Sequence, residues 1–157
     1  MQKNFQRMIE LADKVFDVRH DPGQISVTEQ ERNKLARLHP TTLSQLADGN
    51  GPYTWVLIFP TTHQLMTAFI NGDITEKELL EQTPENASYD AIYLCSALTL
   101  EEYRHQGNTR KLTIDAINQI RKDHPIKFLF VWPFTNEGDL LSEGLAEAIG
   151  LPLLQKK

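Results

Sequence analysis

The sequence contains one cysteine, Cys95, among its 157 residues, so it holds no internal disulfide framework. A lone cysteine inside an apolar segment is most simply a small core residue, and it fits a reducing compartment. Positive charge is also scarce, because 16 Lys and Arg oppose 21 Asp and Glu and leave a formal net charge of -5. This acidic balance argues against a nucleic-acid partner. The five histidines are scattered along the chain, so we expect no metal site.

Long apolar runs are absent as well. The longest, such as YTWVLIFP, are far too short to cross a bilayer, and the amino-terminal MQKNFQRMIELADKVF carries charges throughout, unlike a signal peptide. We therefore expect a soluble, cytoplasmic protein without a membrane partner. With 40% hydrophobic residues, the chain can form the core of one domain that spans residues 1–157.

Apolar residues at spacings of three and four predict helices, and short β-rich apolar segments predict buried strands. The first expected helix covers residues 1–18, and the second follows the Thr28–Glu31 capping box and ends before Pro40. The third is marked by an apolar stripe over residues 65–70, and a short fourth helix follows the Thr75–Glu78 capping box. The fifth is marked by apolar residues over 112–120 and stops at His124–Pro125, and a last helix ends at Gly150. The expected strands are Tyr53–Phe59, Ala91–Leu98 and Lys127–Trp132. The segment Ser44–Pro52 is loop-like.

The order of these elements predicts an α/β fold. From residue 91 onwards the order is strand, glycine-containing turn, helix, strand and helix. Such an order indicates a βαβ unit with two parallel strands, followed by one helix. The part before residue 90 is rich in predicted helices.

The stretch TLEEYRHQGNTRKL, Thr99–Leu112, gathers positive charge around Gly107. In a βα unit, the turn after the strand lies at the sheet edge where ligands usually bind, and the next helix presents unpaired N–H groups. These features suit a phosphate-like anion, which would explain the cations Arg104, Arg110 and Lys111 at a helix start. Alternatively, Gly107 only supplies a positive φ and the cations are solvated. The stretch lacks the P-loop ending and G-x-G-x-x-G, which argues against nucleotide triphosphate hydrolysis and dinucleotide binding.

The residues EEYRHQGNTRKL resemble the pyrophosphate-binding motif of the GNAT superfamily of N-acyltransferases. That motif reads Arg or Gln, any two residues, Gly, any residue, then Gly or Ala, between a strand and a helix. Arg104 stands at its first place, Gly107 at its fourth, and Thr109 where Gly or Ala is usual. The segments KFLFVWPF and TNEGDLLSEGLAEAIGL then resemble the family's next strand and its N…LYEKLGF segment, with Asn136 and Gly150 at the matching Asn and Gly.

This resemblance implies a GNAT-like mixed central sheet with splayed parallel strands, helices on both faces, and acetyl-CoA or another acyl-CoA as co-substrate between those strands. Backbone groups near Leu98, Thr99 and Leu100 would pair with the pantetheine arm, and one N–H there would polarise the thioester carbonyl. Asn136 would approach the cofactor from the second strand. The expected cofactor contacts in the pyrophosphate turn are Arg104, His105, Gln106, Gly107, Asn108 and Thr109.

Catalysis in this family is direct transfer of the acyl group to a primary amine, which a small molecule or a protein carries. The amine must be uncharged to attack, so a base is needed. Glu101 and Glu102 are candidates for this base by position. Alternatively, Glu102 forms a capping box with Thr99. His105 is a weaker candidate, since it falls within the phosphate turn.

The chain departs from the family at two places. The family often has a tyrosine in its last helix that protonates the leaving thiolate; its place falls on Ala146, and no tyrosine follows Tyr103. The carboxyl end is shortened, since LPLLQKK can supply at most one short strand. Either the sheet is reduced, another subunit of a homodimer completes it, or the usual acceptor site is missing. The alternative function is a non-catalytic GNAT-like module that binds CoA or a protein partner.

Overall fold

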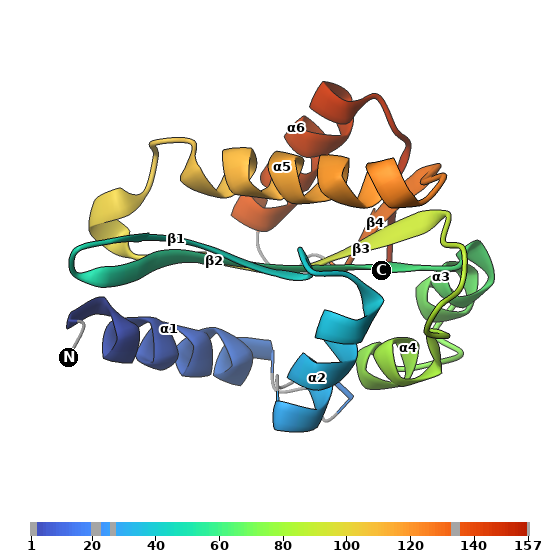
Figure 1. Cartoon of the computed structure of the whole chain (residues 1–157), viewed down its shortest axis with the longest axis horizontal. Coiled ribbons are helices and arrows are strands. Elements are labelled where there is room, and N and C mark those ends of the chain that lie inside the picture. The colour runs from blue at the N-terminus through green and yellow to red at the C-terminus, as the bar shows by residue number, and fades with distance from the viewer. Residues whose placement is uncertain (1–2, 20–22, 26–27, 133–135, 157) are drawn as a thin grey trace.

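A computed structural model describes residues 3–19, 23–25, 28–132 and 136–156 of the chain, and the side chains of residues 3–14, 23–25, 28–132 and 142–156. The fold is mixed α/β, as the sequence predicts, with one five-stranded mixed sheet between two layers of helices. Figure 1 shows α5 (Asn108–Asp123) and α6 (Asn136–Ile149) on one face of the sheet. On the other face lie α1 (Lys3–Arg19), α2 (Glu29–Leu38) and α4 (Glu76–Gln82), with α3 (His63–Ile70) beside α4.

The strands follow the order of the sequence across the sheet. They are β1 (Leu43–Asp48), β2 (Gly51–Thr61), β3 (Ala91–Thr99), β4 (Phe128–Val131) and β5 (Leu153–Gln155). The helices are α1 (Lys3–Arg19), α2 (Glu29–Leu38), α3 (His63–Ile70), α4 (Glu76–Gln82), α5 (Asn108–Asp123) and α6 (Asn136–Ile149), and a single 3-10 turn, η1, covers Glu101–Tyr103. All six predicted helices and all three predicted strands are confirmed, apart from residues 1–2 of the first helix, which lie outside the described residues. Strand β5 agrees with the expectation that the carboxyl end supplies at most one short strand.

The predicted loop Ser44–Pro52 is wrong, because most of it is the edge strand β1 and the hairpin turn into β2. The side chain of Asp48 accepts a hydrogen bond from the Asn50 N–H at 2.8 Å, and Gly51 has a φ of 105°, which closes the turn. Residues of β1 alternate between exposed and half-buried. The strand therefore forms no apolar run that a sequence pattern could reveal.

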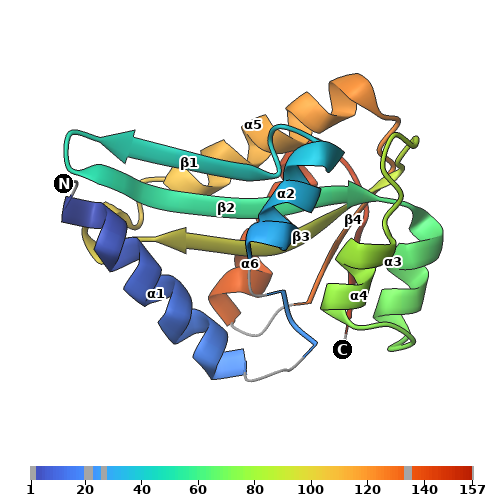
Figure 2. The same cartoon turned by 60° about the horizontal axis from the view of Figure 1, so that its bottom comes forward.

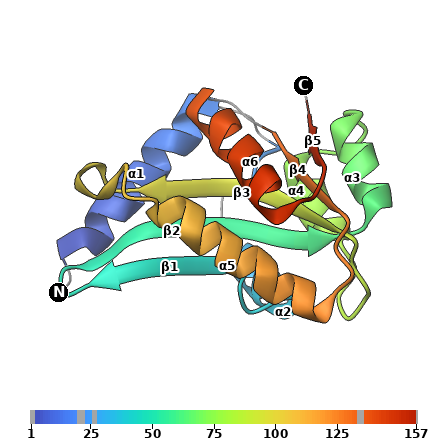
Figure 3. The same ribbon diagram turned by 90° about the horizontal axis from the view of Figure 1, so that it is seen from above.

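Strands β1, β2 and β3 are antiparallel, whereas β3, β4 and β5 are parallel. The predicted parallel pair is thus confirmed as β3 and β4. These two strands pair only over Ala91–Leu94 and Phe128–Val131, and β3 continues for five more residues along β2. Figures 2 and 3 show β3 running on past the end of β4. A bulge opposite Leu57 and Ile58 makes Cys95 the extra residue, directly after the last residue of β3 that pairs with β4.

Two apolar clusters hold the layers together. The large one fills both faces of the sheet, and at its centre the rings of Phe69, Tyr93 and Phe130 are packed against one another. The small one joins Met8 of α1 to Leu98 and Leu100 at the end of β3. Cys95 is buried in the large cluster, which confirms its predicted core position.

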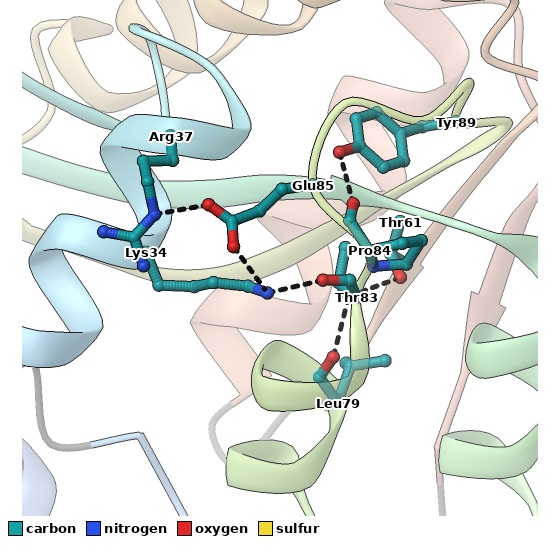
Figure 4. A network of polar contacts seen from close by, with 8 residues as sticks. All are labelled: Lys34, Arg37, Thr61, Leu79, Thr83, Pro84, Glu85 and Tyr89. Carbon is teal, nitrogen blue, oxygen red and sulfur yellow. Dashed lines mark hydrogen bonds and ion pairs between the residues drawn. The ribbon is translucent and has the colours of Figure 1, made fainter.

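Polar contacts fix the amino-terminal helices to the sheet. Both predicted capping boxes are present, at Thr28 of α2 and Thr75 of α4. Figure 4 shows how α2 is attached to the segment between α4 and β3: Lys34 donates to the Thr83 carbonyl at 2.6 Å, and Lys34 and Arg37 both pair with Glu85. These contacts keep α2 and α4 at the end of the sheet remote from the β3–α5 turn.

Candidate functional site

The candidate site is built on the segment that links the end of β3 to the start of α5. After Thr99 the chain forms η1, and the Tyr103 ring stacks on Tyr53 of β2 with 4.2 Å between centroids and 9° between planes. The Tyr103 hydroxyl donates to Asp48 at 2.6 Å, which lowers the pKa of Asp48 and raises that of Tyr103. The turn is thus anchored to the β1–β2 hairpin before it reaches the glycine.

The backbone of the turn has two residues in the left-handed region, His105 at a φ of 64° and Gly107 at 76°. The side chains beside them fold back onto the turn: Gln106 donates to the Glu102 carbonyl at 3.4 Å, and Asn108 donates to the Tyr103 carbonyl at 3.0 Å. These bonds fix the backbone without using its N–H groups. A turn with left-handed residues can present successive N–H groups to one anion.

The first turn of α5 has no side-chain cap, because its N-cap is Gly107. Within the described residues, the N–H groups of Gly107, Asn108, Thr109 and Arg110 donate to no protein acceptor. His105, Gln106 and Gly107 are exposed, and Asn108 and Thr109 are half-exposed. The helix end therefore offers several donors to an incoming ligand.

The cations of the stretch have different neighbours. Arg104 Nε donates to the Thr99 carbonyl at 3.0 Å, which places its guanidinium at the end of β3. Arg110 extends toward α6, since a Cβ at Gly144 would lie 3.7 Å from its Nη1. Lys111 is exposed. Arg104 thus lies at the end of β3, and Arg110 lies between α5 and α6.

The edge of β3 that faces away from β2 forms the second part of the site. The Leu100 N–H donates to the Tyr53 carbonyl at 3.0 Å, so the pair Leu100–Tyr53 is hydrogen-bonded. Because bonded and non-bonded pairs alternate in antiparallel ladders, the backbone groups of Thr99 and Ala97 point to the opposite edge. On that edge the pairing with β4 has already ended at Leu94.

Because of this register, the three residues predicted to pair with the pantetheine arm direct their backbone groups to opposite edges of β3. Thr99 presents its backbone to the open edge, whereas Leu98 and Leu100 direct theirs toward β2 and bury their side chains beneath α1. Ala97, which the sequence argument did not name, presents its backbone beside Thr99. Strand alternation was the signal that could have identified it, once the position of β2 was known.

Thr109, which stands where the motif resembled by this stretch usually has Gly or Ala, ties α5 to the sheet. Its hydroxyl lies 2.7 Å from the hydroxyl of Thr99, which in turn lies 3.1 Å from that of Thr54 in β2. Thr113 also donates to the Thr109 carbonyl at 2.7 Å. The hydroxyl of Thr109 therefore fixes the distance between the end of β3 and the first turn of α5.

The two candidate bases differ in their surroundings. Glu102 pairs with Arg7 of α1 at 2.7 Å, and this hydrogen bond is the main cause that lowers the pKa of Glu102. The alternative of a capping box with Thr99 is wrong, because the N-cap residue of η1 is Leu100 and no side chain caps this turn. Glu101 is exposed, and its carbonyl accepts a bond from the Arg104 N–H at 3.2 Å.

Two predicted positions lie in α6. Asn136 begins the helix, but its side chain lies outside the described residues. Ala146, at the place where the family often has a tyrosine, is 8% exposed and packs in the large cluster. Its carbonyl accepts bonds from Gly150 and Leu151, which end the helix at the predicted glycine.

The fold and site define a mixed α/β domain with an uncapped glycine turn at the carboxyl end of a partly unpaired parallel strand. No protein-family model, curated protein or solved structure matches the chain. In the described ranges, no group of three or more His, Cys, Asp and Glu side chains is placed to hold a metal ion. None of the helices described is both long and apolar enough to cross a membrane.

Proposed function

We propose that the protein binds an acyl-CoA along the open edge of β3 and the Gly107 turn, and transfers the acyl group to a primary amine. The main support for this proposal is that two sets of available backbone groups follow one another without a gap. Backbone groups of Ala97 and Thr99 line the open edge, and the free N–H groups of residues 107–110 follow directly. An extended amide-containing arm that ends in a pyrophosphate matches this order of groups.

The pyrophosphate would bind the N–H groups at the start of α5, where the helix dipole and the cations Arg104 and Arg110 favour negative charge. The pantetheine amides would pair with the backbone of Ala97 and with the Thr99 N–H as an added strand does, because the Thr99 carbonyl already accepts from Arg104. An N–H on this edge would then donate to the thioester oxygen, where negative charge develops as the amine attacks.

In the transfer step, the amine nitrogen forms a bond to the thioester carbon, the carbon–sulfur bond breaks, and CoA leaves as the thiolate. The proton lost by the amine goes to a base, directly or through water. Glu101 fits this role better than Glu102, because the contact with Arg7 weakens Glu102 as a base. Water protonates the thiolate, since Ala146 has no acidic group.

The binding part of the proposal is tested by a thermal-shift titration with acetyl-CoA. Gly107 has a positive φ, which Asn and Asp tolerate better than other residues, and a Cβ there would meet no atom within 4 Å. Gly107→Asn and Gly107→Asp therefore form a matched pair that differs in charge. We expect acetyl-CoA to raise the melting temperature of the wild type and of Gly107→Asn, and to raise that of Gly107→Asp much less. Equal shifts in the two variants would contradict the site.

A non-catalytic module that binds CoA is the second candidate function. The burial of Ala146 in the core supports it, because the thiolate-protonating group of the family is replaced by a packing residue. Release of free thiol from acetyl-CoA, followed across a panel of primary amines, separates the two candidates. Amine-dependent release supports transfer, and binding without release with any amine supports the module.

A further inference from the structure

The side chain of Lys156 extends over two aromatic rings beside the end of β4. Its Nζ lies 5.3 Å from the centroid of the Phe69 ring and 5.7 Å from that of Trp132. The two rings are 5.9 Å apart and nearly perpendicular, with 79° between their planes. A cation within about 6 Å of a ring face is attracted by the ring quadrupole. One ammonium group is therefore held by two rings at once.

The aromatic pair holds this charge without a carboxylate. In the described part of the chain, Lys156 makes no ion pair. On another side the ammonium faces Gly72, in the turn between α3 and α4, where a Cβ would lie 3.7 Å from Nζ. The surroundings thus suit a small cationic group on an aliphatic chain.

Lys156 directly follows β5, the shortest strand of the sheet. Its N–H donates to the Val131 carbonyl at 2.9 Å, just after the three residue pairs that join β5 to β4. A short edge strand opens at lower free energy than the centre of a sheet. Phe69 is fully buried and Trp132 half-buried with Lys156 in place, so opening this segment would expose an aromatic pair ready for another cation.

We propose that Phe69 and Trp132 form a recognition site for an aliphatic primary ammonium, and that Lys156 is an internal occupant which the ligand displaces. Trp132 directly follows β4, so the site lies at the same end of the parallel strands as the open edge of β3. The identification of this site as the binding place of an acceptor amine rests on the proposed acyl transfer. The identification of it as an ammonium site depends only on the geometry of the two rings. Lys156 lowers the apparent affinity because it competes at a high local concentration.

The test is an NMR titration with butylammonium chloride at constant ionic strength and without CoA, following the two tryptophan indole N–H resonances. We expect the Trp132 resonance to shift saturably and the Trp55 resonance to stay, and 1-butanol to cause no comparable shift. Lys156→Gln should lower the apparent Kd roughly tenfold, whereas the exposed Lys122→Gln on α5 should leave it unchanged. Trp132→Leu should abolish binding; because this variant lacks the reporter indole, its binding is observed through the resonances of butylammonium.

An equal Kd for Lys156→Gln and Lys122→Gln would overturn the proposal, as would equal shifts with 1-butanol or unweakened binding to Trp132→Leu. Because CoA is absent, these outcomes do not depend on acyl-CoA binding. If the protein binds butylammonium but not acetyl-CoA, the ammonium site is supported and the proposed acyl transfer is contradicted. If it binds acetyl-CoA but not butylammonium, the cofactor site is supported and the ammonium site is contradicted.

Discussion

At the scale of single residues, Thr109 couples the proposed phosphate turn to the sheet. Its hydroxyl contacts that of Thr99, so removing it separates the first turn of α5 from the end of β3. Thr109→Val keeps the branched shape and should lower the free energy of unfolding by about 1 kcal/mol in urea denaturation. Thr67→Val, whose hydroxyl bonds only to the preceding turn at an exposed position, is the control. Equal losses in both variants would show that the contact with Thr99 has no special role.

His124 makes stability depend on pH. It ends α5, with its ring 4.6 Å from that of Tyr89, and burial is the main cause that lowers its pKa. As the pH falls below about 6.5, the unfolded chain takes up this proton before the folded one, so the folded state loses stability until the pH reaches the lower folded pKa. His124→Phe, which keeps the ring contact, should lose less stability between about pH 7.5 and about pH 5.5. Urea unfolding at both pH values provides the comparison, and parallel losses would contradict the assignment.

At the scale of elements, the capping boxes stabilise helices through hydrogen bonds, and this contribution can be measured separately from that of core packing. Thr28 caps α2 and accepts a bond from the Glu31 N–H at 3.2 Å. Thr28→Ala should lower the free energy of unfolding by about 1 kcal/mol. Thr28→Ser keeps a capping hydroxyl and should retain most of this stabilisation. Chemical denaturation of the three proteins measures this difference. Equal stability of the Ala and Ser variants would contradict the capping role.

The elements with a strong pattern were predictable from the sequence. Each helix has its own apolar period or cap, and β2, β3 and β4 are apolar runs that need no partner to be recognised. The edge strand β1 was missed because its residues are mostly exposed or half-buried, and only the pairing of Leu43–Asp48 with β2 makes it a strand. Pairing of this kind is a tertiary property.

The location of the Gly107 turn in the chain was predictable from the sequence, whereas the long-range contacts around it were not. The turn around Gly107, between a buried strand and a helix, is local and follows from the sequence. The contact of Arg7 with Glu102 joins residues 95 positions apart, and no local pattern could indicate it. The direction of the Thr99 backbone depends on the register with β2, which the sequence does not specify.

At the scale of the whole molecule, β2 and β3 cross both apolar clusters, so the clusters should unfold together. Trp55 packs at the small cluster and Trp132 against the large one. In Trp55→Phe and Trp132→Phe, the remaining tryptophan reports on one cluster. We expect the fluorescence transition in urea to coincide with that of far-UV circular dichroism in each variant. Separate transitions in the variant that retains Trp55 would show that the α1 layer unfolds independently.

Backbone amide chemical shifts report most directly on where CoA binds. In a titration of 15N-labelled protein with CoA, we expect the largest shifts at the amides of residues 106–110, together with those of Ala97 and Thr99 on the open edge of β3. These are the groups that the sheet register and the uncapped start of α5 leave available. If saturating CoA moved no amides, or only amides remote from this turn and edge, the account would be contradicted.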